Sequence, residues 1–174
     1  MRAGLLGVCL LFPSLAFAEE TTRPYSVRSA DELVRMTECQ LLELFRAAEP
    51  GPKPEGYTPG TVISKPGSKT TVLKSKIIKK TFWQGKYFDG DVMTNKMFGI
   101  KMSKGQLADE TSWIDGRPVH AIEYPSNSLV FRKNRDEIRE VAPGIYLGIM
   151  WNKDVCPPKI ANWFVLEACP CTCR

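Results

Sequence analysis

The segment SWIDGRPVHAIEYP (112–125) holds the only histidine of the chain, His120, between two carboxylates. A histidine oriented by a carboxylate is a common general base. If the residues before Tyr124 form a strand, however, His120 shares a face with Tyr124, and Glu123 points to the opposite face. Asp115 belongs to an Asp-Gly turn. If this face looks into the barrel, we expect His120 and Tyr124 to contact a ligand. A structural or surface role for His120 and catalysis by His120 are the alternatives.

A second charged group follows in the segment from 132 to 140, where arginines alternate with carboxylates. The neighbouring pair Asp136 and Glu137 is a candidate for general acid–base catalysis. Alternating charges along a strand are also typical of cross-strand ion pairs. If the fold has a ligand-binding mouth, Arg135 or Arg139 would neutralise an anionic head group there.

Aromatic and methionine side chains are frequent between Phe82 and Phe164. A small barrel needs such residues to fill its interior, but an eight-stranded barrel also has room for one small ligand. We predict that Trp83, Trp113 and Tyr146 contact an apolar ligand. With a single histidine and no phosphate-binding glycine motif, we expect neither a metal nor another cofactor.

The first 18 residues have the pattern of a secretory signal peptide. Arg2 precedes a short apolar run, and Ala16-Phe17-Ala18 forms an A-x-A cleavage site. No later segment is long enough to cross a bilayer. We therefore expect an exported protein, periplasmic or extracellular, that is not transmembrane.

Five cysteines follow the expected cleavage site. In an oxidising compartment these should pair, and the odd count leaves one thiol free or available to a partner. Disulfides that tie the tail to the body are the favoured interpretation, with intermolecular, redox and metal-binding roles as alternatives. The disulfide candidates are Cys39, Cys156, Cys169, Cys171 and Cys173.

No Asp or Glu occurs from Gly56 to Phe88, although lysines are frequent from Lys65 to Lys86. Such a block favours anionic partners, but it is also typical of a solvated face whose charge is balanced elsewhere. The segment lacks the arginine-rich, aromatic-interleaved pattern of a nucleic-acid surface, so we expect no nucleic-acid partner.

The elements that position these residues follow from periodicity and turn residues. A capping box at Ser29–Glu32 and apolar residues at helical spacing predict one helix before a Pro-rich connector. The segment 69–80 is ambiguous between helix and strand, and we favour a helix. From Phe82 onward, period-two alternation broken by Asp-Gly and Pro-Gly turns predicts about eight short antiparallel strands.

Several motifs together resemble a family of exported bacterial proteins of unassigned activity. They are WQGKYFDG (83–90), NKMFG (95–99), SWIDGRP (112–118), RDEIREVAPGIYLG (135–148) and WFVLE (163–167). More distantly, the order of these motifs is similar to that of the lipocalin-like G-x-W-x-G proteins. The resemblance implies a lipocalin-like barrel with an early inserted helix, and it implies no catalytic residues.

We therefore predict a mainly β protein, a lipocalin-like antiparallel β-barrel with an N-terminal α-helix and a short inserted helix. The expected divisions are a signal peptide (1–18), helix and connector (19–55), barrel (56–168) and Cys-rich tail (169–174). The expected function is non-catalytic binding of a small apolar or amphipathic, lipid-like molecule. The alternatives are a hydrolase or isomerase using His120 or Asp136/Glu137, and an envelope interaction protein using the lysine block and tail cysteines.

Overall fold

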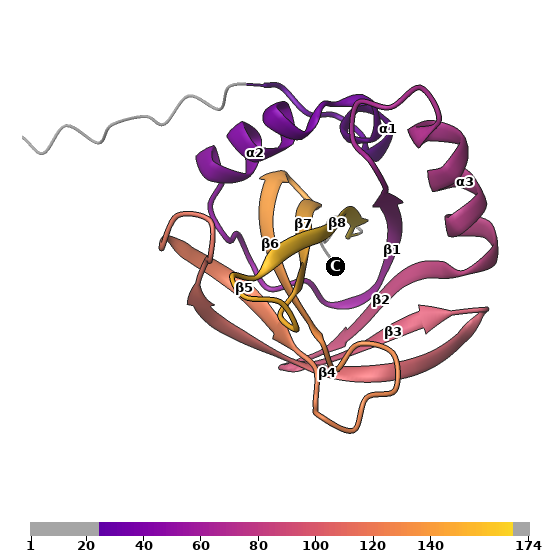
Figure 1. Ribbon diagram of the computed structural model, residues 1–174, viewed down its shortest axis with the longest axis vertical. Helices are drawn as coiled ribbons and strands as arrows, with labels where there is room; N and C mark the ends of the chain where they lie inside the picture. Colours follow the sequence, from indigo (N-terminus) through magenta and orange to yellow (C-terminus); the bar gives the residue numbers. More distant parts are fainter. Residues whose placement is uncertain (1–24, 169–174) are drawn as a thin grey trace, which may run out of the picture.

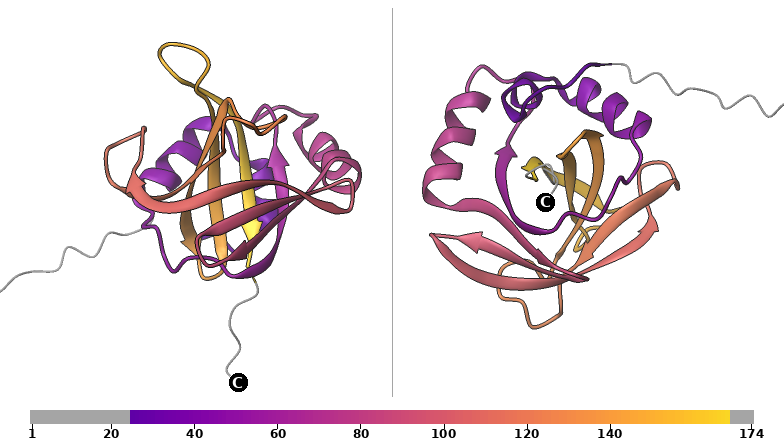
Figure 2. Two further views of the ribbon diagram at one scale, coloured as in Figure 1. Left: turned by 90° about the horizontal axis from the view of Figure 1, so that it is seen from below. Right: turned by 180° about the vertical axis from the view of Figure 1, so that it is seen from behind.

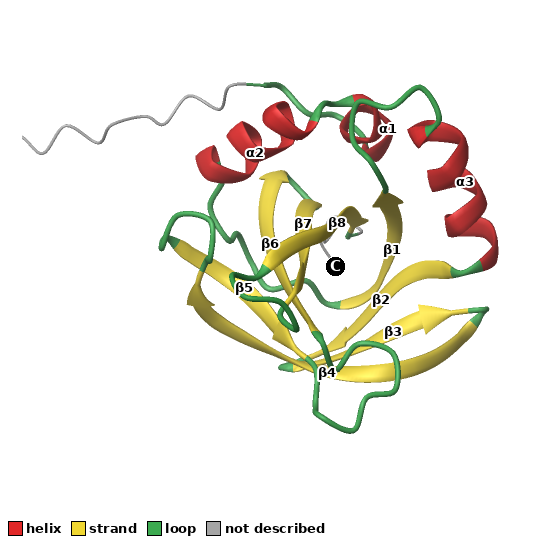
Figure 3. Ribbon diagram, in the orientation of Figure 1, coloured by secondary structure: helices red, strands yellow, loops and turns green. Residues whose placement is uncertain are grey.

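A computed structural model describes residues 25–168 and shows a closed barrel of eight antiparallel strands (Figures 1 and 3). Each strand pairs with its neighbours in the sequence, and the last strand pairs with the first. The strands are β1 (Gly56–Ile63), β2 (Trp83–Asp89), β3 (Val92–Met97), β4 (Ile100–Thr111), β5 (Pro118–Glu123), β6 (Asn134–Ala142), β7 (Ile145–Asn152) and β8 (Lys159–Glu167). The predicted fold class is confirmed.

Three helices accompany the barrel: α1 (Ala30–Arg35), α2 (Glu38–Ala47) and α3 (Thr71–Thr81). The single predicted N-terminal helix is thus two, because the chain leaves the helical conformation at Met36. The predicted capping box at Ser29 is wrong, since the Ser29 side chain makes no capping hydrogen bond. A capping box forms instead at the start of α2, where Thr37 and Gln40 exchange side-chain and backbone hydrogen bonds. The inserted helix favoured at 69–80 is confirmed as α3.

The strands separate two apolar cores. One fills the barrel interior and includes Trp83, Met93, Ile122 and Phe164. The other lies outside the barrel, where α1 and α2 pack on strands β5 to β8 through residues such as Phe45. Because this part of the wall is covered by helices, its strands are buried on both faces, as in the patterns of β6 and β7.

The two ends of the barrel differ. The Pro-rich connector between α2 and β1 crosses one end, which we call the closed end (Figure 1). There the carbonyl of Gly51 accepts from His120, the carbonyl of Pro52 accepts from Tyr146, and Lys53 pairs with Asp91. We call the opposite end the mouth. It carries α3 and the β3–β4, β5–β6 and β7–β8 connections, and the last of these projects from the barrel in Figure 2.

The described residues contain no disulfide, and both Cys39 and Cys156 are exposed thiols. The expected signal peptide and Cys169, Cys171 and Cys173 lie outside the described residues, so the predicted disulfides stay predictions. No helix within residues 25–168 is long and apolar enough to cross a membrane.

We predict that Phe45→Ala lowers the free energy of unfolding by about 3–5 kcal/mol. The Phe45 ring is fully buried, meets the Trp163 ring edge-on and lies 4.7 Å from the Arg139 guanidinium. Urea denaturation followed by circular dichroism measures the change. Leu73→Ala on the exposed face of α3 is the control, with an expected change within about 0.5 kcal/mol. Equal effects of the two substitutions would show that α2 is not part of the cooperative fold.

Candidate ligand-binding site in the barrel

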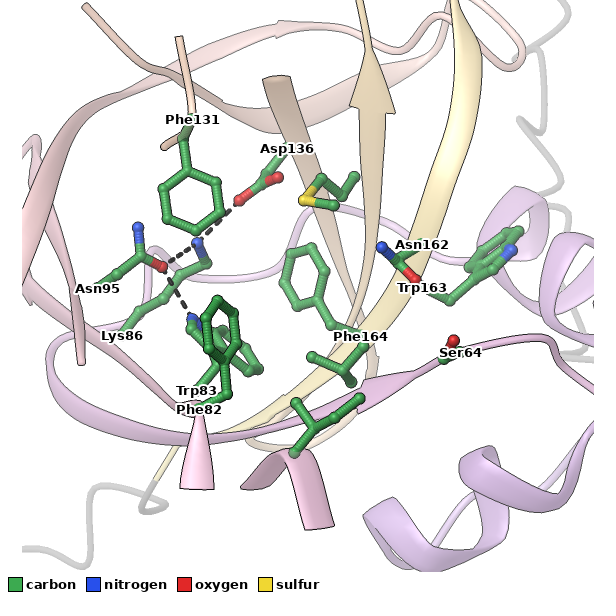
Figure 4. A pocket seen from close by; sticks show the side chains of 13 residues that line it. Ser64, Phe82, Trp83, Lys86, Asn95, Phe131, Asp136, Asn162, Trp163 and Phe164 are labelled. Carbon is green, nitrogen blue, oxygen red and sulfur yellow. Dashed lines mark hydrogen bonds and ion pairs between the residues drawn. The ribbon is translucent and has the colours of Figure 1, made fainter. Parts of the chain in front are cut away.

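A cavity of about 310 Å³ opens at the mouth of the barrel (Figure 4). Most of its wall is apolar, with side chains from β1, α3, β7, β8 and the β5–β6 connection. Three polar side chains, Lys86, Asn95 and Asp136, lie together on one side of it. The other lining residues are Val62, Ser64, Ile78, Phe82, Trp83, Phe131, Met150, Asn162, Trp163 and Phe164.

Two glycines make room for the aromatic rings of this wall. The Trp83 ring lies over Gly60 of the neighbouring strand, where an added Cβ would come within 2.3 Å of the ring. The Phe164 ring covers Gly148 in the same way, at 2.2 Å. The two rings meet edge-on, with their centroids 5.7 Å apart. A side chain at either glycine would displace a ring that lines the cavity.

A β-bulge brings Trp83 and Lys86 to the same interior face. Strict alternation would place residues of opposite parity on opposite faces of β2. The register shifts between Trp83 and Gly85, and Gly85 has φ +129°, in the region that favours glycine. A side chain at Gly85 would also lie 2.1 Å from the carbonyl oxygen of Thr58. The glycine of W-Q-G-K therefore turns the Lys86 ammonium into the barrel.

Lys86 is the centre of a buried hydrogen-bond network. Its Nζ donates to Asn95 Oδ1 (3.0 Å), Tyr124 Oη (2.8 Å) and Asp136 Oδ2 (2.8 Å). These three acceptors match the three donors of an ammonium group. The Tyr124 hydroxyl donates to Asp136 Oδ2 at 2.7 Å, and Trp83 Nε1 donates to Asn95 Oδ1 at 2.9 Å. Side chains from four parts of the barrel are thus tied together in its interior.

One atom of this network has no partner: Asp136 Oδ1 is buried and accepts no hydrogen bond. Asp136 also lines the cavity. Buried carboxylate oxygens are normally hydrogen-bonded, because an unsatisfied acceptor keeps its full desolvation cost. The site therefore holds a buried acceptor without a partner in a residue that lines the cavity.

Burial sets the protonation behaviour of the two groups beside Asp136. Burial lowers the pKa of the Lys86 ammonium, and the charge and hydrogen bond of Asp136 oppose that shift. Burial raises the pKa of the Tyr124 phenol well above its ordinary 10.0, and the Asp136 charge adds to the rise. The phenol therefore stays neutral and keeps its hydrogen bond to Asp136.

The face that carries His120, Ile122 and Tyr124 looks into the barrel, but its residues lie at different heights. Tyr124 belongs to the Lys86 network near the cavity. His120 lies at the closed end, with Nδ1 2.6 Å from Asp109 Oδ1 and Nε2 2.9 Å from the carbonyl oxygen of Gly51. The hydrogen bond from His120 lowers the pKa of the Asp109 carboxyl. Both imidazole nitrogens thus hold structure together, and neither lines the cavity.

Tyr146 also faces the interior at the closed end, where its hydroxyl donates to the Pro52 carbonyl at 2.7 Å. Of the predicted ligand contacts, only Trp83 lines the cavity directly, and Tyr124 adjoins it through Lys86 and Asp136. His120 and Tyr146 instead hold the connector across the closed end.

Arg135 and Arg139, the predicted anchors of an anionic head group, do not line the cavity. Both point away from the interior, because they alternate with Asp136 and Ile138 along β6. Arg139 is fully buried and makes two 2.8 Å hydrogen bonds to the Asp115 carboxylate. These contacts belong to the covered outer wall, where α2 and the β4–β5 loop meet.

Arg135 pairs with Glu110 of β4 and Glu123 of β5, which confirms the cross-strand ion pairs expected for this segment. It also pairs with Glu137 of its own strand. Its guanidinium also lies 4.7 Å from the Trp113 ring. Trp113 is partly exposed on the outer wall and does not line the cavity. The structure thus places Trp113 away from the cavity in which its ligand contact was expected.

Asp136 and Glu137 do not form a catalytic pair, since they point to opposite faces of β6. Glu137 is buried on the outer side, where it accepts from Ser112 Oγ at 2.6 Å and the Trp113 amide at 2.9 Å. No group of three or more His, Cys, Asp or Glu side chains within residues 25–168 is placed to hold a metal ion.

Lys86 and Asn95 are the site residues that sequence reasoning missed. The lysine-rich composition of its segment favours a solvated Lys86, yet its side chain is 2% exposed. The available signal was the glycine in W-Q-G-K, because a glycine inside a strand often marks a bulge that redirects the next side chain. For Asn95 the signal was its placement between Met93 and Met97, which share its face and are buried.

The comparisons with known proteins identify the fold alone. No family model matches the chain, and no curated protein matches it. A crystal structure of a protein from Thermomonospora curvata is similar, with a TM-score of 0.54 and 18% sequence identity. The match covers 77% of this chain and 88% of that one. This likeness supports the class of protein, a small closed β-barrel, and leaves the resemblance to lipocalin-like proteins a prediction.

We predict that Lys86→Met lowers the free energy of unfolding by about 3–5 kcal/mol, because it leaves the buried Asp136 carboxylate without its countercharge. The double variant Lys86→Met/Asp136→Leu removes both charges and should recover at least half of that loss. Chemical denaturation of both variants measures the difference. If the double variant is less stable than the single one, the ion pair is not what stabilises this cluster.

The raised pKa of Tyr124 predicts a pH dependence of stability. In the folded protein the Tyr124 phenol keeps its proton above pH 10.0, the ordinary pKa that it has in the unfolded chain. Its contribution to stability is therefore complete below pH 10.0 and is lost as the pH rises through the folded pKa. Spectrophotometric titration at 295 nm should show a delayed step that includes Tyr124, which ionises only as the protein unfolds. Tyr124→Phe should lower the amplitude of that delayed step by one tyrosine, whereas Tyr57→Phe at a partly exposed position should leave it unchanged.

Proposed function

We propose that this protein binds a small amphipathic molecule in the barrel cavity and does so without catalysing a reaction. The apolar wall would hold the body of the ligand, and the polar side formed by Lys86, Asn95 and Asp136 would hold its polar group. The cavity volume lies at the small end of the range for ligand pockets, about 300–1,000 Å³. The proposal includes export to the periplasm or medium, on the basis of the signal-peptide pattern in residues 1–18.

The observation that carries this proposal is the unpartnered oxygen of Asp136. A purely structural ion pair has no need to leave a buried acceptor without a partner in a residue that lines a cavity. A ligand that donates a hydrogen bond to Asp136 Oδ1 would complete the network. Hydrogen bonds to charged groups contribute about 1.5–3 kcal/mol, which is enough to select ligands that carry a donor.

The charge balance of the site favours a neutral polar group. Lys86 and Asp136 lie 2.8 Å apart and compensate each other in a buried setting. A ligand carboxylate would add an uncompensated negative charge beside Asp136, and a ligand ammonium would add a positive charge beside Lys86. A hydroxyl or amide adds neither. We therefore expect the ligand to carry a neutral hydrogen-bond donor at the end of an apolar body, and not the anionic head group that the sequence predicts.

The enzymatic alternatives gain no support from the geometry. Both nitrogens of His120 are occupied by Asp109 and the connector, and all three donors of Lys86 have acceptors. Glu137 lies on the other side of the barrel wall from Asp136. A general base needs an accessible lone pair next to a substrate, and these groups do not offer one.

The experiment compares three probes with the same eight-carbon chain: 1-octanol, octanoate and octylammonium. Isothermal titration calorimetry should show that 1-octanol binds about tenfold or more tightly than either ion, because only the alcohol donates to Asp136 without adding charge. Val62→Phe fills part of the cavity and should weaken 1-octanol binding about tenfold. The same substitution at Val155, which is exposed in the β7–β8 connection and does not line the cavity, should leave binding unchanged.

Two results would contradict the proposal. Tightest binding of octanoate would show that the polar side of the cavity selects an anion. If none of the probes binds, and native mass spectrometry of protein from its own host also shows no retained small molecule, the cavity is not a binding site.

A further inference from the structure

Exposed apolar side chains gather at the mouth of the barrel. Leu73 and Ile77 lie one helical turn apart on the solvent-facing side of α3, where they are 63% and 53% exposed. Phe98 and Ile100 at the β3–β4 turn are 62% and 61% exposed. The Phe98 ring meets the Phe82 ring edge-on with centroids 5.1 Å apart, which joins the turn to the end of α3.

Lysines surround these apolar residues. Lys74, Lys76 and Lys80 are exposed on α3 and form no ion pair with any described residue. Lys76 and Lys80 lie one turn apart and adjoin Ile77 on the helix surface. The segment from Gly56 to Phe88 contains no acidic residue that would balance them. We call the set formed by Leu73, Ile77, Phe82, Phe98, Ile100 and these three lysines the mouth surface.

The charge is distributed according to the topology of the barrel. The four connections at the mouth, residues 64–82, 98–99, 124–133 and 153–158, hold nine basic residues and one acidic residue. At the closed end, the connections 90–91, 112–117 and 143–144 together with residues 48–55 hold two basic and four acidic residues. The molecule is therefore electrically polar along the barrel axis, with its positive end at the cavity opening.

We propose that the mouth surface docks on an anionic lipid bilayer. Apolar side chains beside lysines match the interface of such a bilayer, where the apolar tips enter the acyl boundary and the ammonium groups reach the lipid phosphates. A folded protein partner would need a shaped complementary surface, whereas the mouth surface is a helix face and a turn tip with unpaired lysines between them. This proposal rests on surface residues and holds whether or not the cavity binds a ligand.

The docking surface is continuous with the cavity. Ile78 and Phe82 line the cavity, and Phe82 is also 42% exposed in the mouth surface. A bilayer in contact with Phe82 and Phe98 would therefore adjoin the opening. An amphipathic molecule could then pass between bilayer and barrel along apolar side chains.

Vesicle co-sedimentation tests the proposal with protein purified in the form that its host processes. Vesicles of equal parts phosphatidylcholine and phosphatidylglycerol should bind the protein about tenfold or more strongly than vesicles of phosphatidylcholine alone. The triple variant Lys74→Gln/Lys76→Gln/Lys80→Gln should lose about tenfold or more of this partitioning. The matched triple variant Arg28→Gln/Arg35→Gln/Arg46→Gln changes the net charge equally at exposed sites before the barrel and should change partitioning by about twofold or less.

The apolar part of the surface is tested separately. Ile77→Ser and Phe98→Ser should each weaken binding to anionic vesicles about fivefold, and Val92→Ser at the opposite end should not. All these positions are exposed, so the variants should keep their fold, which circular dichroism verifies. The proposal would be overturned if the lysine triple variant and the arginine triple variant lost vesicle partitioning equally. It would also be overturned if the protein showed no preference for anionic vesicles. A dimer in sedimentation velocity that Phe98→Ser dissociates would assign the surface to a second copy of the chain, and would overturn it too.

Discussion

The ion pair between Lys86 and Asp136 is the constraint on which the interior depends. Two charges buried in an apolar barrel are tolerated only when their partners are placed accurately, since the desolvation cost of each charge is several kcal/mol. Lys86 comes from β2, Asp136 from β6, and Asn95 and Tyr124 supply the remaining hydrogen bonds from β3 and the end of β5. The same contacts that tie these strands together use one oxygen of Asp136 and leave the second without a partner, in a residue that lines the cavity. Structure and candidate function therefore use one set of atoms.

A second buried network lies on the outer wall and serves a different purpose. Arg139 joins Asp115, the carbonyls of Pro118 and Phe45, and the Phe45 ring, so it fixes α2 and the β4–β5 loop to β6. An arginine suits this position because its planar group makes several directed hydrogen bonds and also stacks on a ring. The two networks lie on opposite faces of β6. Because successive side chains of a strand point to opposite faces, Asp136 joins the inner network and Arg139 the outer one.

The sequence predicted the barrel, its Asp-Gly and Pro-Gly turns and the inserted helix, because these depend on local patterns such as turn residues and period-two alternation. The β3–β4 turn at 98–99 was missed, because the segment 96–103 has the pattern of one continuous strand. The sequence also predicted that His120 and Tyr124 share a face. It could not predict which face of β6 looks inward, because both faces are buried and the usual contrast between polar and apolar sides is absent. The inward direction of Lys86 was also missed, because the bulge at Gly85 shifts the register and reverses which of the following residues point inward. The missed residues are thus the ones fixed by long-range pairing.

The antiparallel topology explains why the two ends of one small barrel can differ so strongly. Successive connections alternate between the ends, so a sequence can place its lysines and exposed apolar residues in every second connection and its acidic turns in the others. The connector then covers the acidic end, held by His120, Tyr146 and Lys53. With that end covered, exchange between cavity and surroundings runs through the mouth, where the apolar residues and the lysines lie. An anionic surface that attracts the positive end of the molecule would therefore also orient the opening of the cavity toward that surface.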